Sequence, residues 1–600
     1  MNITRLLRSI CAVSLLSSAA SVGHAQWITE SFVVKPGWTA VYLNVDPSYE
    51  TLDQLVGSDP FNPIVEIWLW KAPASSLQYL TSPASPLSSG RDWAQWSRPG
   101  VGAASTFNAL IPNAAYLVHS VASTNYTWSI KGKPSPPSYT WTTTGLNFIG
   151  FPTPANNPPA FDSFLSLSPS FAGAAEIYQY TGGDLRPVNP SQVVFLHSTK
   201  VTRGQAFWVR AGSVFNDYFG PFQVSVGSSG GANLGSAGSQ YSIYLHNTTA
   251  SNVVVCASLL ASETPPAGQS PIAGTPPVLV RGDLSTTNLT YSYTDLSTGG
   301  SACWTLKPKG QPGSDITVVV GVNRPAMTGA AGSLYAGILR FTDALNFSQV
   351  DVPVSAQSSS AAGLWVGKAL VTQVGNYLKT YQVDANNSLV ISSNGNYIVT
   401  GINTNLGPVP QAFPLRLILH NDGTNVFLLQ RVFYGLNTGS NLVLATQESA
   451  LDPQHLDTAR RISAADFPWS SANQPWPVSG RLAPGATLSA SVRLAYDDQA
   501  SNPFLHTYHP DHNNLDTTTL PLPTKLPPGS ESYDILRQLT LNLNSPGNDF
   551  ASRTAAGQSL SGTYLETITM TGLGGATRTF QVSGAFILSR ISPIAILTGL

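Results

Sequence analysis

"KPGWTAVYLNVDP", at positions 35–47, decides the fold of the first part of the chain, because it returns in altered form as "TTGLNFIGFPTP" at 143–154. Further elements follow each copy in the same order: "VEIWLW" (65–70) and "AEIYQY" (175–180), "IPNAAYLVHS" (111–120) and "TRGQAFWVRA" (202–211), "YTWSIKG" (126–132) and "FQVSVG" (222–227). A shared order of strand-like elements predicts a repeated supersecondary unit. We therefore expect two copies of one β module, at 26–138 and 139–228.

The composition extends this prediction to the whole chain. Six hundred residues exceed what one hydrophobic core serves, so several domains are expected. Hydrophobic residues make up 42% of the sequence and charged residues 10%, where about 25% charged is usual. Such a mixture favours strands and turns over helices. The predicted fold class is all-β: tandem β-sandwich-like modules, then a larger C-terminal β domain that is sandwich or jelly-roll-like.

The first 25 residues have the pattern of an export signal. Arg5 and Arg8 precede the short apolar run "ICAVSLLSSAASV", and the small residues that suit cleavage end at Ala25.

Removing this segment takes two of the 30 Lys and Arg and none of the 31 Asp and Glu, which leaves a net charge of 28 − 31 = −3. Near-neutrality argues against nucleic acid as a partner, and no later apolar run is long enough for a transmembrane segment. We expect a periplasmic, extracellular or cell-surface protein.

Two low-complexity stretches divide the remainder. We expect a Gly/Ser linker at 229–240, a third module at 241–356, a linker at 357–363 and the C-terminal domain at 364–600. Within the third module, "WTLKPKGQPGSDITVVVGV" (304–322) and the run that ends in "VPVSA" (352–356) resemble the late strands of bacterial immunoglobulin-like sandwich modules. This resemblance implies a spacer or adhesive module. As a whole, the chain resembles the large uncharacterised secreted β-modular proteins of bacteria.

The mature chain keeps two cysteines, Cys256 and Cys303. Export into an oxidising compartment favours a disulfide between them, and two buried free thiols are the alternative. Antibody-type domains place a core tryptophan soon after the first cysteine. Here Trp304 follows the second cysteine, so a disulfide of the antibody type is not expected.

Histidines gather in "NPFLHTYHPDHNNLD" (502–516). A turn at "HPDH" would bring His509 and His512 together, with Asp511 beside them and His506 near by. Such a set suits Zn²⁺ or a similar divalent metal, whereas the Asp and Asn oxygens would suit Ca²⁺. A surface loop without metal is the third interpretation. The stretch also resembles the end of the metallo-β-lactamase signature H-x-H-x-D-H, but Thr507 stands where its first histidine belongs.

Tryptophans supply the other candidate site. Trp68 and Trp70 share one strand face and are expected in the core. Trp93, Trp96, Trp469 and Trp476 lie in loop-like sequence and are candidates for stacking on sugars.

Three functions follow from these features. The first is a structural or adhesive surface protein without catalytic residues, with a polysaccharide or another surface protein as partner. The second is a glycan-binding protein, and the third is a metal-dependent hydrolase that uses the histidine stretch.

Overall fold

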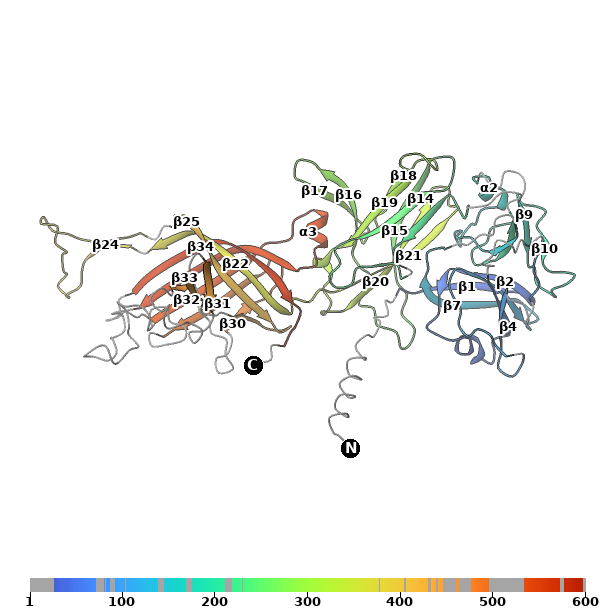
Figure 1. Ribbon diagram of the computed structural model, residues 1–600, viewed down its shortest axis with the longest axis horizontal. Coiled ribbons are helices and arrows are strands. Elements are labelled where there is room, and N and C mark those ends of the chain that lie inside the picture. The colour runs from blue at the N-terminus through green and yellow to red at the C-terminus, as the bar shows by residue number, and fades with distance from the viewer. Residues whose placement is uncertain are drawn as a thin grey trace, which may run out of the picture. The chain divides into compact units, whose positions relative to one another are not determined.

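The computed structural model describes residues 26–596 except 72–79, 81, 87–91, 103, 139–144, 169–174, 211–217, 229, 377, 404–405, 430–432, 439–440, 446–459, 463–475, 496–533 and 572–576. The all-β prediction is confirmed, with 50% strand and 4% helix. The chain forms two compact units (Figure 1). Unit 1 contains residues 1–359 together with 548–556, and unit 2 contains 360–547 and 557–600.

The first copy of the repeat forms two sheets, ordered β2-β6-β4-β5 and β1-β7-β3. Apolar and polar residues alternate in β1, so that Phe32 and Val34 are buried while Val33 is exposed. The elements are β1 (Ile28–Val34), β2 (Gly37–Leu43), β3 (Val45–Asp46), η1 (Asp53–Gly57), β4 (Ile64–Trp70), β5 (Trp93–Ser97), β6 (Ala114–Ser120) and β7 (Tyr126–Pro134).

The second copy repeats the four-stranded sheet in the same order, β8-β11-β9-β10. Its elements are β8 (Asn147–Ile149), α2 (Phe161–Leu165), β9 (Glu176–Gln179), β10 (Ser191–Gln192) and β11 (Phe207–Arg210). The register also coincides. His119 lies opposite Glu66 in the first copy, and Arg210 lies opposite Glu176 in the second.

The two copies share one hydrophobic core. Trp70 and Trp93 from the first copy pack edge-on against Trp208 from the second, with ring centroids 5.0 and 6.5 Å away. Gly150 of the second copy lies so close to the first that an added Cβ would stand 2.4 Å from Cβ of Tyr42. The copies are therefore one packed body and not two independent modules.

The third module is a sandwich of two five-stranded sheets, ordered β12-β14-β19-β16-β17 and β13-β21-β20-β15-β18. Its first strand, β12, is the closing strand of the second copy. The elements are β12 (Phe222–Val226), β13 (Ala232–Asn233), β14 (Tyr241–Asn247), β15 (Val253–Ala261), β16 (Val278–Ser285), β17 (Thr290–Asp295), β18 (Ala302–Leu306), β19 (Asp315–Val322), η3 (Arg324–Ala326), β20 (Leu334–Asp343), β21 (Gln349–Gln357) and α3 (Phe550–Thr554).

The described part of the predicted Gly/Ser linker, residues 230–240, is part of this sandwich, so the prediction of a flexible linker there is wrong. Strand β13 pairs in parallel with β21, and Ala232 and Leu234 are buried in the sandwich core. The Arg324 guanidinium donates hydrogen bonds to the carbonyl oxygens of Leu234, Gly235 and Gly238 at 2.6–3.1 Å. Two apolar side chains and one buried cation order a segment that its composition marks as disordered.

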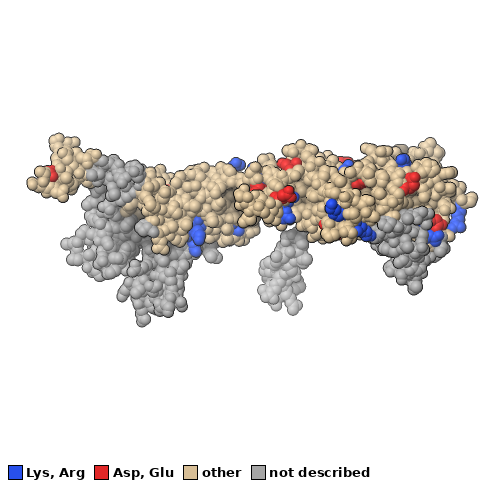
Figure 2. Space-filling view, turned by 90° about the horizontal axis from the view of Figure 1, so that it is seen from above, with Lys and Arg blue, Asp and Glu red and all other residues tan. Residues whose placement is uncertain are grey.

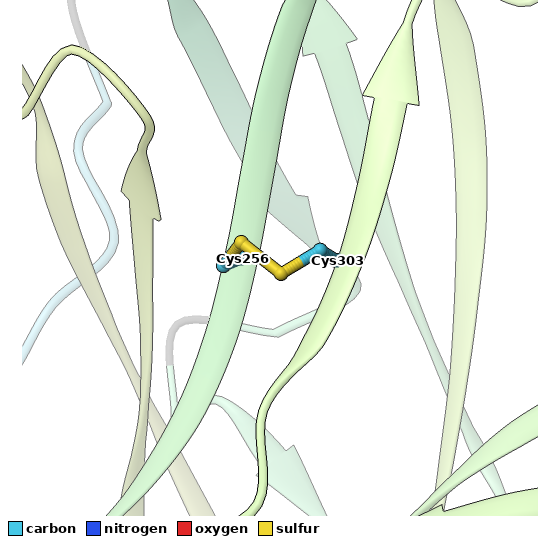
Figure 3. Close-up of a disulfide and its surroundings, with 2 residues drawn as sticks. All are labelled: Cys256 and Cys303. Carbon is cyan, nitrogen blue, oxygen red and sulfur yellow. A yellow bond between two sulfur atoms is a disulfide. The ribbon is translucent and has the colours of Figure 1, made fainter.

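Cys256 and Cys303 form a disulfide (Figure 3). The two residues are direct partners on the neighbouring strands β15 and β18 of one sheet. Cys303 is exposed, so the bond lies on the outer face and does not join the two sheets as an antibody-type disulfide does. It fastens the edge strand β18 and closes a loop with a sequence separation of 47 residues, for which chain entropy gives about 4 kcal/mol of stabilisation.

Unit 2 is built on a barrel of eight antiparallel strands, β22-β25-β26-β30-β31-β32-β33-β34 (Figure 1). The first and last strands of this sheet pair with each other and close the barrel. The sequence had suggested a sandwich or jelly-roll-like domain. Alternate residues point inward, as in β31, where Leu488, Ala490, Val492 and Leu494 are buried and the residues between them are exposed. The interior also holds a buried ion pair between Arg537 and Glu566, 2.5 Å apart.

The strands of unit 2 are β22 (Gly363–Asn376), β23 (Leu378–Tyr381), β24 (Val399–Asn403), β25 (Gly407–Asn421), β26 (Val426–Leu429), β27 (Phe433–Thr438), β28 (Asn441–Ala445), β29 (Arg460–Ile462), β30 (Trp476–Gly480), β31 (Thr487–Leu494), β32 (Asp534–Leu543), β33 (Ser559–Thr571) and β34 (Thr577–Ser592).

A buried ion network centred on Arg203 joins all three modules of unit 1. Arg203 of the second copy donates to Glu30 of the first at 3.0 Å, and its guanidinium lies 3.8 Å from Asp351 of the sandwich. Asp351 also accepts two hydrogen bonds from Arg340, at 2.8 and 2.9 Å. The Asn44 side chain donates to Glu30 at 3.2 Å. Two cations and two anions balance, and the Arg203 and Glu30 side chains are each 10% exposed.

Arg203→Met is expected to lower the free energy of unfolding of unit 1 by about 3–5 kcal/mol, because Glu30 would remain buried without its cation. Urea denaturation followed by tryptophan fluorescence measures this. The matched control is Lys131→Met, which breaks the exposed pair between Lys131 and Glu263, 3.3 Å apart with side chains 32% and 42% exposed. That pair also joins the first copy to the sandwich, yet its loss should cost at most about 1 kcal/mol. Equal effects of the two variants would contradict the role assigned to Arg203.

Candidate functional site

The structure leaves part of the sequence-based site untested. His506, His509, Asp511, His512 and Trp469 lie outside the described residues, so the metal and sugar interpretations of these residues stay predictions. Trp476 is the first residue of β30, and its side chain is likewise not described. Within the described part of the chain, no group of three or more His, Cys, Asp or Glu side chains could hold a metal ion.

Trp93 and Trp96 are not in a loop, and that prediction is wrong. Both lie in β5 and are only 5% and 1% exposed. Every residue of β5 is buried, because the following segment covers this edge strand, with Thr106 bonded to Gln95 on both the backbone and the side chain. A strand covered on both faces shows no alternation, so its sequence resembles a loop. Neither indole presents a face to a sugar.

The repeat instead places a carboxylate, an aromatic donor and a basic side chain together in each copy. In the second copy, Glu176 accepts a hydrogen bond from the Tyr178 hydroxyl at 2.8 Å and forms an ion pair with Arg210. In the first copy, Glu66 accepts from the Trp68 indole N–H at 3.2 Å, and His119 lies opposite on the neighbouring strand. We call these the Glu176 trio and the Glu66 trio.

The trios differ in their basic residue. Arg210 is long enough to reach Glu176, whereas His119 makes no ion pair with Glu66 and stacks on Trp38, with ring centroids 4.6 Å apart and planes 6° from parallel. In the Glu176 trio, burial and then the hydrogen bond and negative charge of Glu176 raise the pKa of Tyr178. That hydroxyl therefore stays protonated and donates to the carboxylate.

Sequence reasoning missed these residues although the signal was present. Glu66 and Glu176 are the charged residues of "VEIWLW" and "AEIYQY", at the same position of the repeat. His119 and Arg210 occupy matching positions in "AAYLVHS" and "AFWVRA". A charge that recurs at one position of two otherwise apolar strands indicates that this side chain has a polar partner. The shared register places that partner opposite it, His119 in the first copy and Arg210 in the second.

A pocket of about 240 Å³ opens where the sheets of the two copies meet. Aromatic residues from both copies line it, namely Tyr42, Trp70 and Phe148, with Lys71, Asn113 and Ser138 as the polar members. Of the tryptophans predicted for sugar binding, Trp93 and Trp96 are described, and neither lines this pocket.

Neither a family model nor a curated protein matches this sequence. Within the described residues, no helix is both long and apolar enough to cross a membrane.

His119→Arg is expected to raise the free energy of unfolding by about 0.5–1 kcal/mol, because arginine can reach Glu66 as Arg210 reaches Glu176. Arg210→His is the reciprocal variant and should lose stability. An imidazole at position 210 would be too short to reach Glu176, as His119 is too short to reach Glu66, so the ion pair with Glu176 would be lost. Thermal unfolding measures these effects, and a destabilising His119→Arg would show that the trios are not equivalent.

Proposed function

We propose that the chain is an exported, non-catalytic structural and adhesive protein. The observation that carries this proposal is the fusion of three modules into one body by the shared aromatic core and the buried network around Arg203. Such a body holds surfaces at fixed positions, which is what a spacer or an adhesin requires. The disulfide that fastens edge strand β18 and the hydrogen bonds that hold the glycine-rich segment at 230–240 support the same function.

The surface of the protein fits contacts with uncharged polymers. On the face that Figure 2 shows, the described Lys, Arg, Asp and Glu are scattered among other residues and do not gather into a field of one sign. Attraction to a highly charged partner would need such a field. A polysaccharide or another low-charge surface is therefore the partner that this proposal favours.

The proposal is tested by mixing the mature chain, from Gln26, with insoluble polysaccharides and with intact cells, followed by sedimentation and product analysis of the supernatant. The expected result is saturable retention of the protein without release of soluble sugar. Arg203→Met should reduce retention at temperatures where unit 1 loosens, while Lys131→Met should not. Soluble products that disappear on addition of EDTA would overturn the proposal in favour of a metal-dependent hydrolase.

A further inference from the structure

We propose that residues 381–400, in the arm formed by β23 and β24, are a self-association site that holds two copies of this chain face to face. These two strands pair with each other and, within the described residues, with no other strand (Figure 1). The inference goes beyond the proposed structural function and does not depend on it. It rests on an eight-residue repeat, on exposed apolar side chains gathered on one face, and on an almost complete lack of charge.

The arm contains three copies of an eight-residue unit, which we call the octads. They read "YQVDANNS" (381–388), "LVISSNGN" (389–396) and "YIVTGINT" (397–404). Each begins with Tyr or Leu and has Val or Ile at its third position. Asn387 and Gly395, at the seventh position of the first two octads, both have a positive φ, 64° and 81°. The first two octads therefore turn at the same place.

Backbone hydrogen bonds join the second residues of the three octads in a closed ring. The N–H of Gln382 donates to the carbonyl of Ile398 at 2.8 Å, and the N–H of Ile398 donates to the carbonyl of Val390 at 3.1 Å. The N–H of Val390 then donates to the carbonyl of Gln382 at 3.0 Å. The third residue of each octad also lies opposite the first residue of the next, in the pairs Val383 and Leu389, Ile391 and Tyr397, and Val399 and Tyr381. The segment therefore has approximate threefold symmetry.

One face of this segment carries six exposed apolar side chains. The first and third residues of each octad point to the same side of the strand, and the pairing between octads places all of them on one face. These side chains are between 37% and 57% exposed. The rings of Tyr381 and Tyr397 touch on this face, with centroids 5.9 Å apart and planes at 72°. The members are Tyr381, Val383, Leu389, Ile391, Tyr397 and Val399.

The lack of charge limits what can cover this face. Asp384 is the one charged residue between positions 380 and 403 of the sequence. It occupies the fourth position of its octad, on the opposite side of the strand, where it accepts hydrogen bonds from the backbone N–H groups of Asn386 and Ser388 at 2.9 and 2.8 Å. Attraction to an anionic lipid surface would need Lys or Arg near the apolar side chains. An uncharged face does not repel a second copy of itself.

A second copy fits this face in area and in symmetry. Six side chains that are about half exposed leave roughly 500 Å² of apolar surface, which is a large patch for a monomer. Two such faces together would bury about 1,000 Å², the lower limit for a specific interface. Because the octads repeat, a twofold axis between two faces sets each apolar pair of one copy against an apolar pair of the other. A partner without this repeat would match one octad at a time.

Sedimentation velocity of the full mature chain between about 1 and 200 µM tests the proposal. The unmutated chain should change from monomer to dimer, with half of it associated between about 10 and 100 µM. Ile391→Glu places an unpaired carboxylate in the interface and should weaken association at least about tenfold. Ile391→Thr keeps a β-branched side chain that suits the strand and should weaken association about threefold to tenfold.

Gln382→Glu is the matched control, because it adds the same charge on the opposite side of the strand. Its association should equal that of the unmutated chain, and an unchanged thermal midpoint for each variant shows that folding is intact. A sedimentation coefficient that does not depend on concentration, or equal effects of Ile391→Glu and Gln382→Glu, would overturn the proposal. So would binding of the monomer to phosphatidylcholine vesicles that Ile391→Glu abolishes, because the face would then belong to lipid. Retention on polysaccharides is measured separately, so either proposal can fail alone.

Discussion

Unit 1 depends on one buried cation. Arg203 touches the carboxylate of Glu30 in the first copy and that of Asp351 in the sandwich, and it also donates to the carbonyl oxygens of Thr153 and Gln349. An ion pair of this kind contributes little net stability compared with an apolar contact, because desolvation offsets the attraction. It contributes geometry instead, since four partners in three segments, one of them in each module, are satisfied in one arrangement only. The three modules are therefore held as one body both by the apolar surface that they bury and by the single arrangement that the Arg203 network allows.

The repeat explains why the aromatic residues are where they are. Each four-stranded sheet is apolar on the face that carries Trp70 or Trp208, and among the described residues neither copy has a second sheet of its own over that face. The two copies cover each other. Tryptophan and phenylalanine fill the space between sheets with few residues, and glycine is required at position 150, where a Cβ would collide with Tyr42 of the first copy. The pocket lies at this interface, and its lining contains Lys71 and Asn113 beside the aromatic residues.

The sequence determined the broad features of the fold and left the pairings open. Composition and alternation were sufficient for the all-β class and for placing Trp68 and Trp70 in the core, where they are 7% and 6% exposed. Barrel closure was hidden, because strands of a closed barrel and of an open sandwich show the same alternation. The order of the glycine-rich stretch depends on Arg324, which lies far along the chain and gives no local signal. The burial of Trp93 and Trp96 was hidden for a similar reason, because it depends on the segment that covers β5 and not on the sequence of β5 itself.

The two trios share one contact and differ in another. Both copies keep the carboxylate and its aromatic donor, so this contact belongs to the architecture of the repeat. The basic residue differs, because Arg210 pairs with Glu176 whereas His119 stacks on Trp38. The second copy is thus closed by an internal ion pair. The first copy has kept Glu66 bonded to one indole, and it also contributes Lys71 and Asn113 to the pocket. The second copy also supplies Arg203 and its share of the common core.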